Sequence, residues 1–194
     1  MADYLPLLRE LTALDPPVFV FGSVAEAVLL DGKLNRSHGD VDLLVPRDEL
    51  ERKQRQLHEL GFERFDVYYE PRPGRPLVLG SSRGELSLEL NAVDYDEAGS
   101  PYFAVDAGSG PVGIFVPPDM FDWPPTPVSG VQVRTVSPLA LIQIRAGLEA
   151  TAVFGPSRPQ KDRPRQRRLL EKYFPGRDPD SLRPDIVRLA ERPS

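Results

Sequence analysis

The chain has 194 residues, of which 40% are hydrophobic, and a formal net charge of −5. This length is enough for one sizeable core, the acidic balance argues against a general nucleic-acid binder, and no apolar run is long enough for a transmembrane helix. The sequence contains no cysteine, which excludes disulfides and thiolate metal sites, and residues 1–15 lack the basic segment of a secretory signal, so we expect a cytoplasmic protein.

Apolar spacing in the first third of the chain predicts two helices and two buried strands. Leucines recur at helical intervals over residues 4–14, and a similar pattern covers 46–60 before Gly61. Apolar runs at 18–21 and 40–45 are typical of strands that are covered on both faces. A Gly-Ser turn and a short helical segment follow the first of these strands.

Short strands dominate the middle of the chain. Residues 62–70 and 77–79 form a predicted strand pair joined by a proline-rich turn, and residues 85–93 alternate between apolar and polar side chains. Further strands are predicted within 102–116 and 131–136.

The last third is predicted to be helical. Ser137 and Pro138 suit the N-cap and first position of a helix over 138–149. Further helices are expected at 162–173 and 181–191.

Gly22 and Ser23 stand between a predicted strand and a predicted helix. Glycine permits a sharp turn and a close backbone approach, and serine can begin a helix whose free N–H groups face outward. A strand, a Gly-Ser turn and a helix N-terminus together predict an anion site suited to phosphate.

Asp40 and Asp42 are two residues apart on the next predicted strand, so their carboxylates point to the same side of it. Two such carboxylates repel each other and raise each other's pKa unless a cation lies between them. A phosphate site beside a divalent-metal site indicates phosphoryl or nucleotidyl transfer.

These residues carry a family resemblance. Gly22-Ser23 followed by Asp40-Val41-Asp42 resembles the pattern of the nucleotidyltransferase superfamily, whose members are DNA polymerase beta-like. The segment from Gly32 to Asp42, which includes Arg36 and His38, resembles that of small nucleotidyltransferases that modify aminoglycosides and lincosamides. The resemblance implies an α+β fold, with a nucleotidyltransferase-like mixed sheet flanked by helices, a catalytic core over 1–136 and a helical C-terminal region over 137–194.

The resemblance also implies a set of metal ligands. Asp40 and Asp42 would hold two Mg²⁺ ions together with a third carboxylate on a strand beside theirs, and Glu89 is our choice for it. The family usually has aspartate there, so Glu89 is a departure. Glu89 can also be read as a solvated edge-strand residue, with Glu85 and Asp94 as the alternative ligands.

The nucleotide would be held by Gly22, Ser23, Arg36 and Lys161. Lys161 belongs to a Lys-Asp pair that matches the family, but the pattern continues with a second aspartate where this chain has Arg165. Any acid–base role of that second aspartate is therefore in doubt. We regard His38 as a positioning residue.

The implied reaction moves a nucleoside monophosphate from a nucleoside triphosphate, with ATP expected, to a hydroxyl of a small, antibiotic-like acceptor and releases pyrophosphate. A monomer or homodimer is expected, and the motifs do not specify the acceptor. One alternative is a toxin–antitoxin type of nucleotidyltransferase that modifies tRNA or protein, favoured by six basic residues within 158–168. Another is an inactive nucleotide-binding homologue, against which the retained carboxylates argue.

Overall fold

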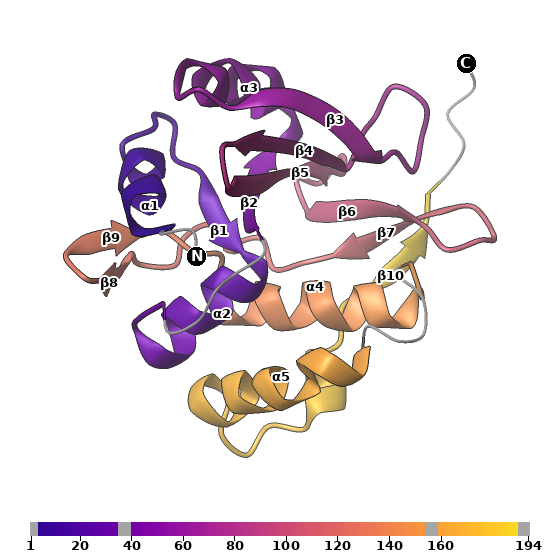
Figure 1. Ribbon diagram of the computed structural model, residues 1–194. Coiled ribbons are helices and arrows are strands. Elements are labelled where there is room, and N and C mark those ends of the chain that lie inside the picture. The colour runs from indigo at the N-terminus through magenta and orange to yellow at the C-terminus, as the bar shows by residue number, and fades with distance from the viewer. Residues whose placement is uncertain (1–3, 35–39, 154–158, 190–194) are drawn as a thin grey trace.

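The computed structural model describes residues 4–34, 40–153 and 159–189 (Figure 1). The helices are α1 (Tyr4–Thr12), α2 (Gly22–Asp31), α3 (Leu50–Glu59), α4 (Pro138–Ala150) and α5 (Pro159–Tyr173), with short 3-10 helices at Arg47–Glu49 and Pro179–Leu182. The strands are β1 (Phe19–Phe21), β2 (Val41–Pro46), β3 (Glu63–Tyr69), β4 (Val78–Arg83), β5 (Leu86–Tyr95), β6 (Pro101–Asp106), β7 (Pro111–Phe115), β8 (Thr126–Val128), β9 (Val131–Val133) and β10 (Ile186–Arg188).

The strands form a mixed sheet in which β2 and β5 run parallel to each other. β1 flanks β2, while β4 and then β3 flank β5, and these neighbours pair antiparallel. The end of β5 continues into an antiparallel arrangement of β6, β7 and β10. β8 and β9 form a separate hairpin.

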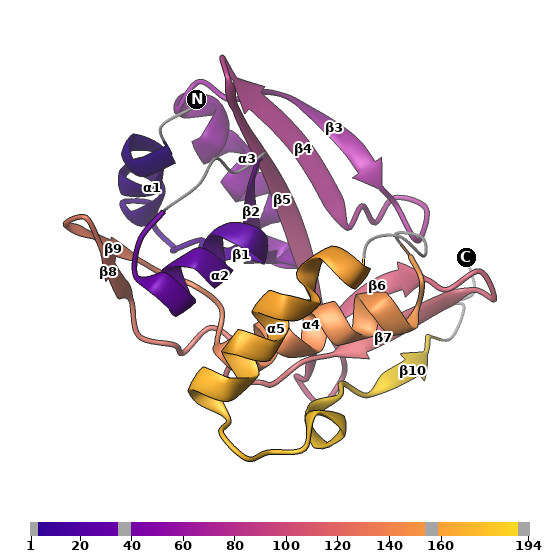
Figure 2. The ribbon, with the colours of Figure 1, turned by 60° about the horizontal axis from the view of Figure 1, so that its bottom comes forward.

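Helices cover both faces of the central strands, which explains why β2 is apolar on both sides. Leu43 and Leu90 lie opposite each other on one face, Leu44 lies on the other, and all three are fully buried. In Figure 2, α2, α4 and α5 lie on the near side of the sheet, and no helix lies in front of β3 and β4. The outer strands therefore leave part of this face uncovered.

The helix predicted over 181–191 is wrong. The chain forms a 3-10 turn at Pro179–Leu182 and then β10, which pairs antiparallel with the edge of β7. Pro184 removes a backbone donor and biases Arg183 away from helical geometry, and the β-branched Ile186 and Val187 favour a strand. Among the described residues, no helix has both the length and the apolar character needed to cross a membrane.

Candidate active site

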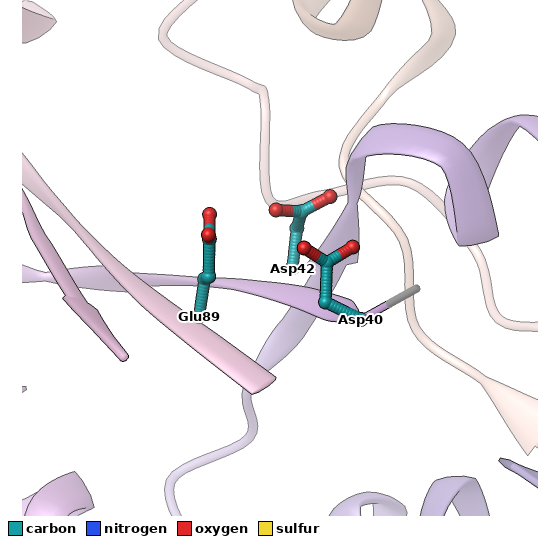
Figure 3. Close-up of side chains that lie close together, drawn as sticks. All are labelled: Asp40, Asp42 and Glu89. Atoms are coloured by element: carbon teal, nitrogen blue, oxygen red, sulfur yellow. The ribbon is translucent and has the colours of Figure 1, made fainter. Parts of the chain in front are cut away.

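Asp40, Asp42 and Glu89 lie together where β2 and β5 run side by side. Asp42 is opposite Glu89 in the parallel register and opposite Phe21 in the antiparallel pairing with β1, and Asp40 directly precedes β2. Paired residues of neighbouring strands project from the same face of a sheet. Figure 3 shows the three carboxylates pointing the same way, and one carboxylate oxygen from each lies within 4.8 Å of the others.

The electrostatics of this cluster disfavour three free negative charges. Burial raises the pKa of Asp42 well above its usual range, and the charges of Asp40 and Glu89 raise it further, while nearby Arg145 lowers it. A divalent cation would reverse this effect, because it favours the ionised form of every carboxylate around it. Three oxygen donors without sulfur or imidazole fit Mg²⁺, so the donor set suits the implied metal.

The turn at Gly22 places the N-terminus of α2 directly beside Asp42. Gly22 has φ +65°, and a Cβ there would lie 2.7 Å from the Asp42 carboxylate carbon and closer still to its Oδ2. Only glycine therefore lets the chain leave β1 and begin α2 this close to the carboxylate. Ser23 is in the first turn of α2, and the N-terminal end of a helix favours an anion.

The positions of two expected nucleotide ligands, Arg36 and Lys161, cannot be compared with those of Gly22 and Ser23. Arg36, like His38, lies outside the described residues. Lys161 belongs to α5, of which only the backbone is described at this position. Their nucleotide-binding roles stay predictions.

A second charged cluster beside the site was missed in the sequence. Glu26 of α2 is completely buried, and its carboxylate lies 2.5 Å from Nε of Arg145 in α4 and 3.3 Å from Nη1 of Arg165 in α5. Glu26 is one turn after Ser23, on the same side of the helix. The available signal was the lone acidic residue within the apolar run from Val24 to Leu30.

The alternatives for the third carboxylate lie elsewhere. Glu85 is exposed in the turn before β5. Asp94 is 2% exposed near the other end of β5, where Arg47 donates two hydrogen bonds to it at 2.6 and 3.0 Å and Arg72 and Arg75 also pair with it. Although burial raises the pKa of Asp94, Arg47 and Arg75 outweigh it and hold the pKa below its usual value. Through these ion pairs, Asp94 of β5 links two other segments: the 3-10 helix after β2, which carries Arg47, and the β3–β4 turn, which carries Arg72 and Arg75.

No family model matches the sequence, and no curated protein matches it. The structure is similar to the solution structure of the antibiotic-resistance factor ANT(2'')-Ia, with a TM-score of 0.62 and 18% identity over 91% of this chain and 86% of that chain. The crystal structure of ANT(2'')-Ia in complex with adenylyl-2''-tobramycin gives a TM-score of 0.62 and 16% identity, over 91% and 90% of the two chains. The crystal structure of the lincosamide antibiotic adenylyltransferase LnuA, with lincomycin bound, gives a TM-score of 0.49 and 17% identity, over 78% of this chain and 84% of that chain.

The two similarities to ANT(2'')-Ia, an aminoglycoside nucleotidyltransferase, concern the fold. They confirm the α+β, nucleotidyltransferase-like fold that the sequence pattern predicts.

Proposed function

We propose that the protein is a Mg²⁺-dependent nucleotidyltransferase that moves a nucleoside monophosphate from a nucleoside triphosphate, with ATP as the expected donor, to a hydroxyl of a small, antibiotic-like acceptor. The observation that carries this proposal is the cluster of Asp40, Asp42 and Glu89 directly beside the N-terminus of α2. A structure with the same fold holds adenylyl-2''-tobramycin, an adenylylated antibiotic, which supports this kind of acceptor.

The three carboxylates would hold two Mg²⁺ ions. When bound, the ions would lower the pKa of the acceptor hydroxyl and stabilise the charge on the entering and leaving oxygens. The backbone N–H groups of Gly22 and Ser23 at the N-terminus of α2 would bind the phosphate tail. In the reaction the acceptor oxygen bonds to the α-phosphorus, its proton is lost to water, and the bond between that phosphorus and the pyrophosphate oxygen breaks.

Arg145 and Arg165 would supply positive charge on the phosphate side. Both guanidinium groups contact Glu26, whose single negative charge can balance only one of them. Burial of Glu26 favours this arrangement, because a carboxylate removed from water needs charged or hydrogen-bonding partners, and both arginines contact it.

The test is pyrophosphate release with Mg²⁺ and each nucleoside triphosphate across a panel of aminoglycosides and lincosamides. We expect release that depends on one acceptor and on Mg²⁺. Absence of release with every acceptor, while calorimetry still shows Mg²⁺-dependent nucleotide binding, would contradict the small-molecule reaction. It would favour a macromolecular acceptor or an inactive homologue.

Replacing Glu89 with glutamine is expected to lower turnover by about a hundredfold or more, because the amide keeps the shape but loses the charge that binds the cation. Glu85→Gln is the matched control four residues earlier in the sequence, and it should leave the pyrophosphate-release rate unchanged. The opposite ranking of the two variants would transfer the role of third ligand to Glu85.

Replacing Arg165 with glutamine is expected to raise the KM for the nucleotide about thirtyfold, because a charge-assisted bond to phosphate contributes about 2 kcal/mol. The KM for the acceptor should not change. Arg167→Gln is the control in the same helix, since Arg167 is 81% exposed and pairs with Glu171. A change in the acceptor KM alone would contradict the nucleotide-binding role and place Arg165 near the acceptor instead.

The basic run of α5 gives little support to a nucleic-acid substrate. Arg167 and Arg168 pair with Glu171 and Asp31, and Arg165 shares the buried Glu26 with Arg145, so three of its six basic residues already contact acidic neighbours within the protein. The division into a catalytic core at 1–136 and a helical region at 137–194 stays a proposal, as do a cytoplasmic location and a monomer or homodimer.

A further inference from the structure

One row of residues crosses the open part of the sheet. Glu89 of β5 lies opposite Asp42 of β2 on one side and opposite Gly80 of β4 on the other. Because paired residues project from the same face, a side chain at position 80 would point to the face that carries the three carboxylates.

Tyr68 of β3 occupies the space that Gly80 leaves. A Cβ at Gly80 would overlap the Tyr68 ring, 2.7 Å from Cδ2 and closer to two other ring atoms. The pairing of β3 with β4 is irregular between Val67 and Tyr69, which is where Tyr68 lies. The ring therefore lies over the backbone of Gly80, one strand beyond Glu89, and Tyr68 is 59% exposed.

Asp66 belongs to the same row. It lies opposite Gly80 in the register of β3 with β4, and it is exposed. Its carboxylate therefore projects from the same face as Tyr68 and Glu89.

The two sides of the carboxylate cluster differ in chemistry. On the Asp42 side lie the N-terminus of α2 and the arginines bound to Glu26, which suit an anion. On the Glu89 side lie an uncovered aromatic ring and a carboxylate. With the nucleotide on the Asp42 side of the carboxylate cluster, the acceptor has to reach the cluster from the Glu89 side.

We propose that Tyr68 and Asp66 form the acceptor subsite and select a cationic, aminosugar-like ring. The Tyr68 face would attract an ammonium group through its ring quadrupole, and Asp66 would pair with a second one. Gly80 allows the ring to lie close to the sheet and so near Glu89. This inference rests on the proposed function, because that function decides which side the acceptor occupies.

The test uses the full chain and tobramycin as the cationic probe, with binding measured by calorimetry in addition to KM values. Tyr68→Ala is expected to weaken tobramycin binding and raise its KM about tenfold, with the nucleotide KM unchanged. Tyr68→Phe should bind like the wild type, because the ring face is kept. Asp66→Asn should weaken binding and reduce its dependence on salt.

Tyr95→Ala is the matched control, because Tyr95 is also an exposed tyrosine at 45% but lies at the far end of β5, opposite Pro101. It should leave tobramycin binding unchanged. Equal binding by Tyr68→Ala and the wild type, or a loss that affects nucleotide and tobramycin alike, would overturn the proposal. So would a wild-type protein that uses only neutral acceptors, although pyrophosphate release would then still support the proposed function. No release with any acceptor overturns both.

Discussion

Replacing Asp42 with asparagine is expected to lower pyrophosphate release about a thousandfold or more and, at the same time, to raise the Tm of the metal-free protein by a few degrees. The loss of activity follows because asparagine removes the charge of the central member of the three proposed metal ligands. The gain in stability follows because Asp42 is partly buried between two other carboxylates, and its raised pKa shows that the folded state disfavours its negative charge. When replacing a residue stabilises the fold but abolishes activity, the native residue is typically kept for function.

The pH dependence of this effect has a definite sign. The pKa of Asp42 in the folded protein lies above its ordinary value of 3.8, so folding binds a proton and the unfolded chain releases it. Without metal, the contribution of Asp42 to stability therefore falls as the pH rises from that value through the raised pKa. The Tm difference between Asp42→Asn and the wild type should widen over this range and then become constant.

Thermal unfolding of both proteins from acidic to neutral pH, with and without Mg²⁺, measures these effects. Mg²⁺ should raise the Tm of the wild type more than that of the variant, since it binds the ionised cluster. Asp119→Asn, an exposed aspartate with no part in the site, is the control and should change neither Tm nor turnover. A lower Tm for metal-free Asp42→Asn at neutral pH would contradict the proposed repulsion.

The parts of the site that depend on local sequence could be predicted. Gly22 and Ser23 are adjacent, and Asp40 and Asp42 are two residues apart, so their relative placement follows from the geometry of a turn and a strand. The central helices and strands were predictable for the same reason, because each has its own apolar period. The choice of Glu89 over Glu85 required the register between two strands, because only the parallel pairing of β5 with β2 places Glu89 opposite Asp42.

The contacts that depend on long-range packing could not be predicted. Arg165 meets Glu26 across 139 positions of sequence, and no local pattern encodes which helix will cover α2. Tyr68 covers Gly80 only because the strand pairing is irregular there, a feature that alternation alone does not reveal. The wrong prediction of a helix at 181–191 also reflects long-range packing, because Ile186–Arg188 pair as a strand with the edge of β7.

Replacing Gly22 with alanine is expected to lower turnover about a hundredfold and to destabilise the fold by about 3 kcal/mol, through two separate effects. The first is backbone strain, since φ at Gly22 is +65°. The second is steric, because the new Cβ would overlap the Asp42 carboxylate and displace it.

Gly32 separates the two effects. Its φ is +63°, but a Cβ there would have no heavy atom within 4 Å, so Gly32→Ala introduces the strain without the overlap. We expect this control to cost about 1 kcal/mol in denaturant unfolding and to leave pyrophosphate release and Mg²⁺ binding unchanged. Similar losses of activity in both variants would show that strain alone accounts for the Gly22 effect.

The overlap itself can be measured in a double-mutant cycle with Asp42→Ala. Removing the carboxylate makes room for the new Cβ, so Gly22→Ala should destabilise the Asp42→Ala background by less than it destabilises the wild type. The difference isolates the contact between the turn and the carboxylate from the strain that both backgrounds share. If the two costs are equal, Asp42 does not constrain position 22. If they differ, the glycine is required because Asp42, a proposed metal ligand, lies against the backbone that begins α2, and the two halves of the proposed site cannot vary independently.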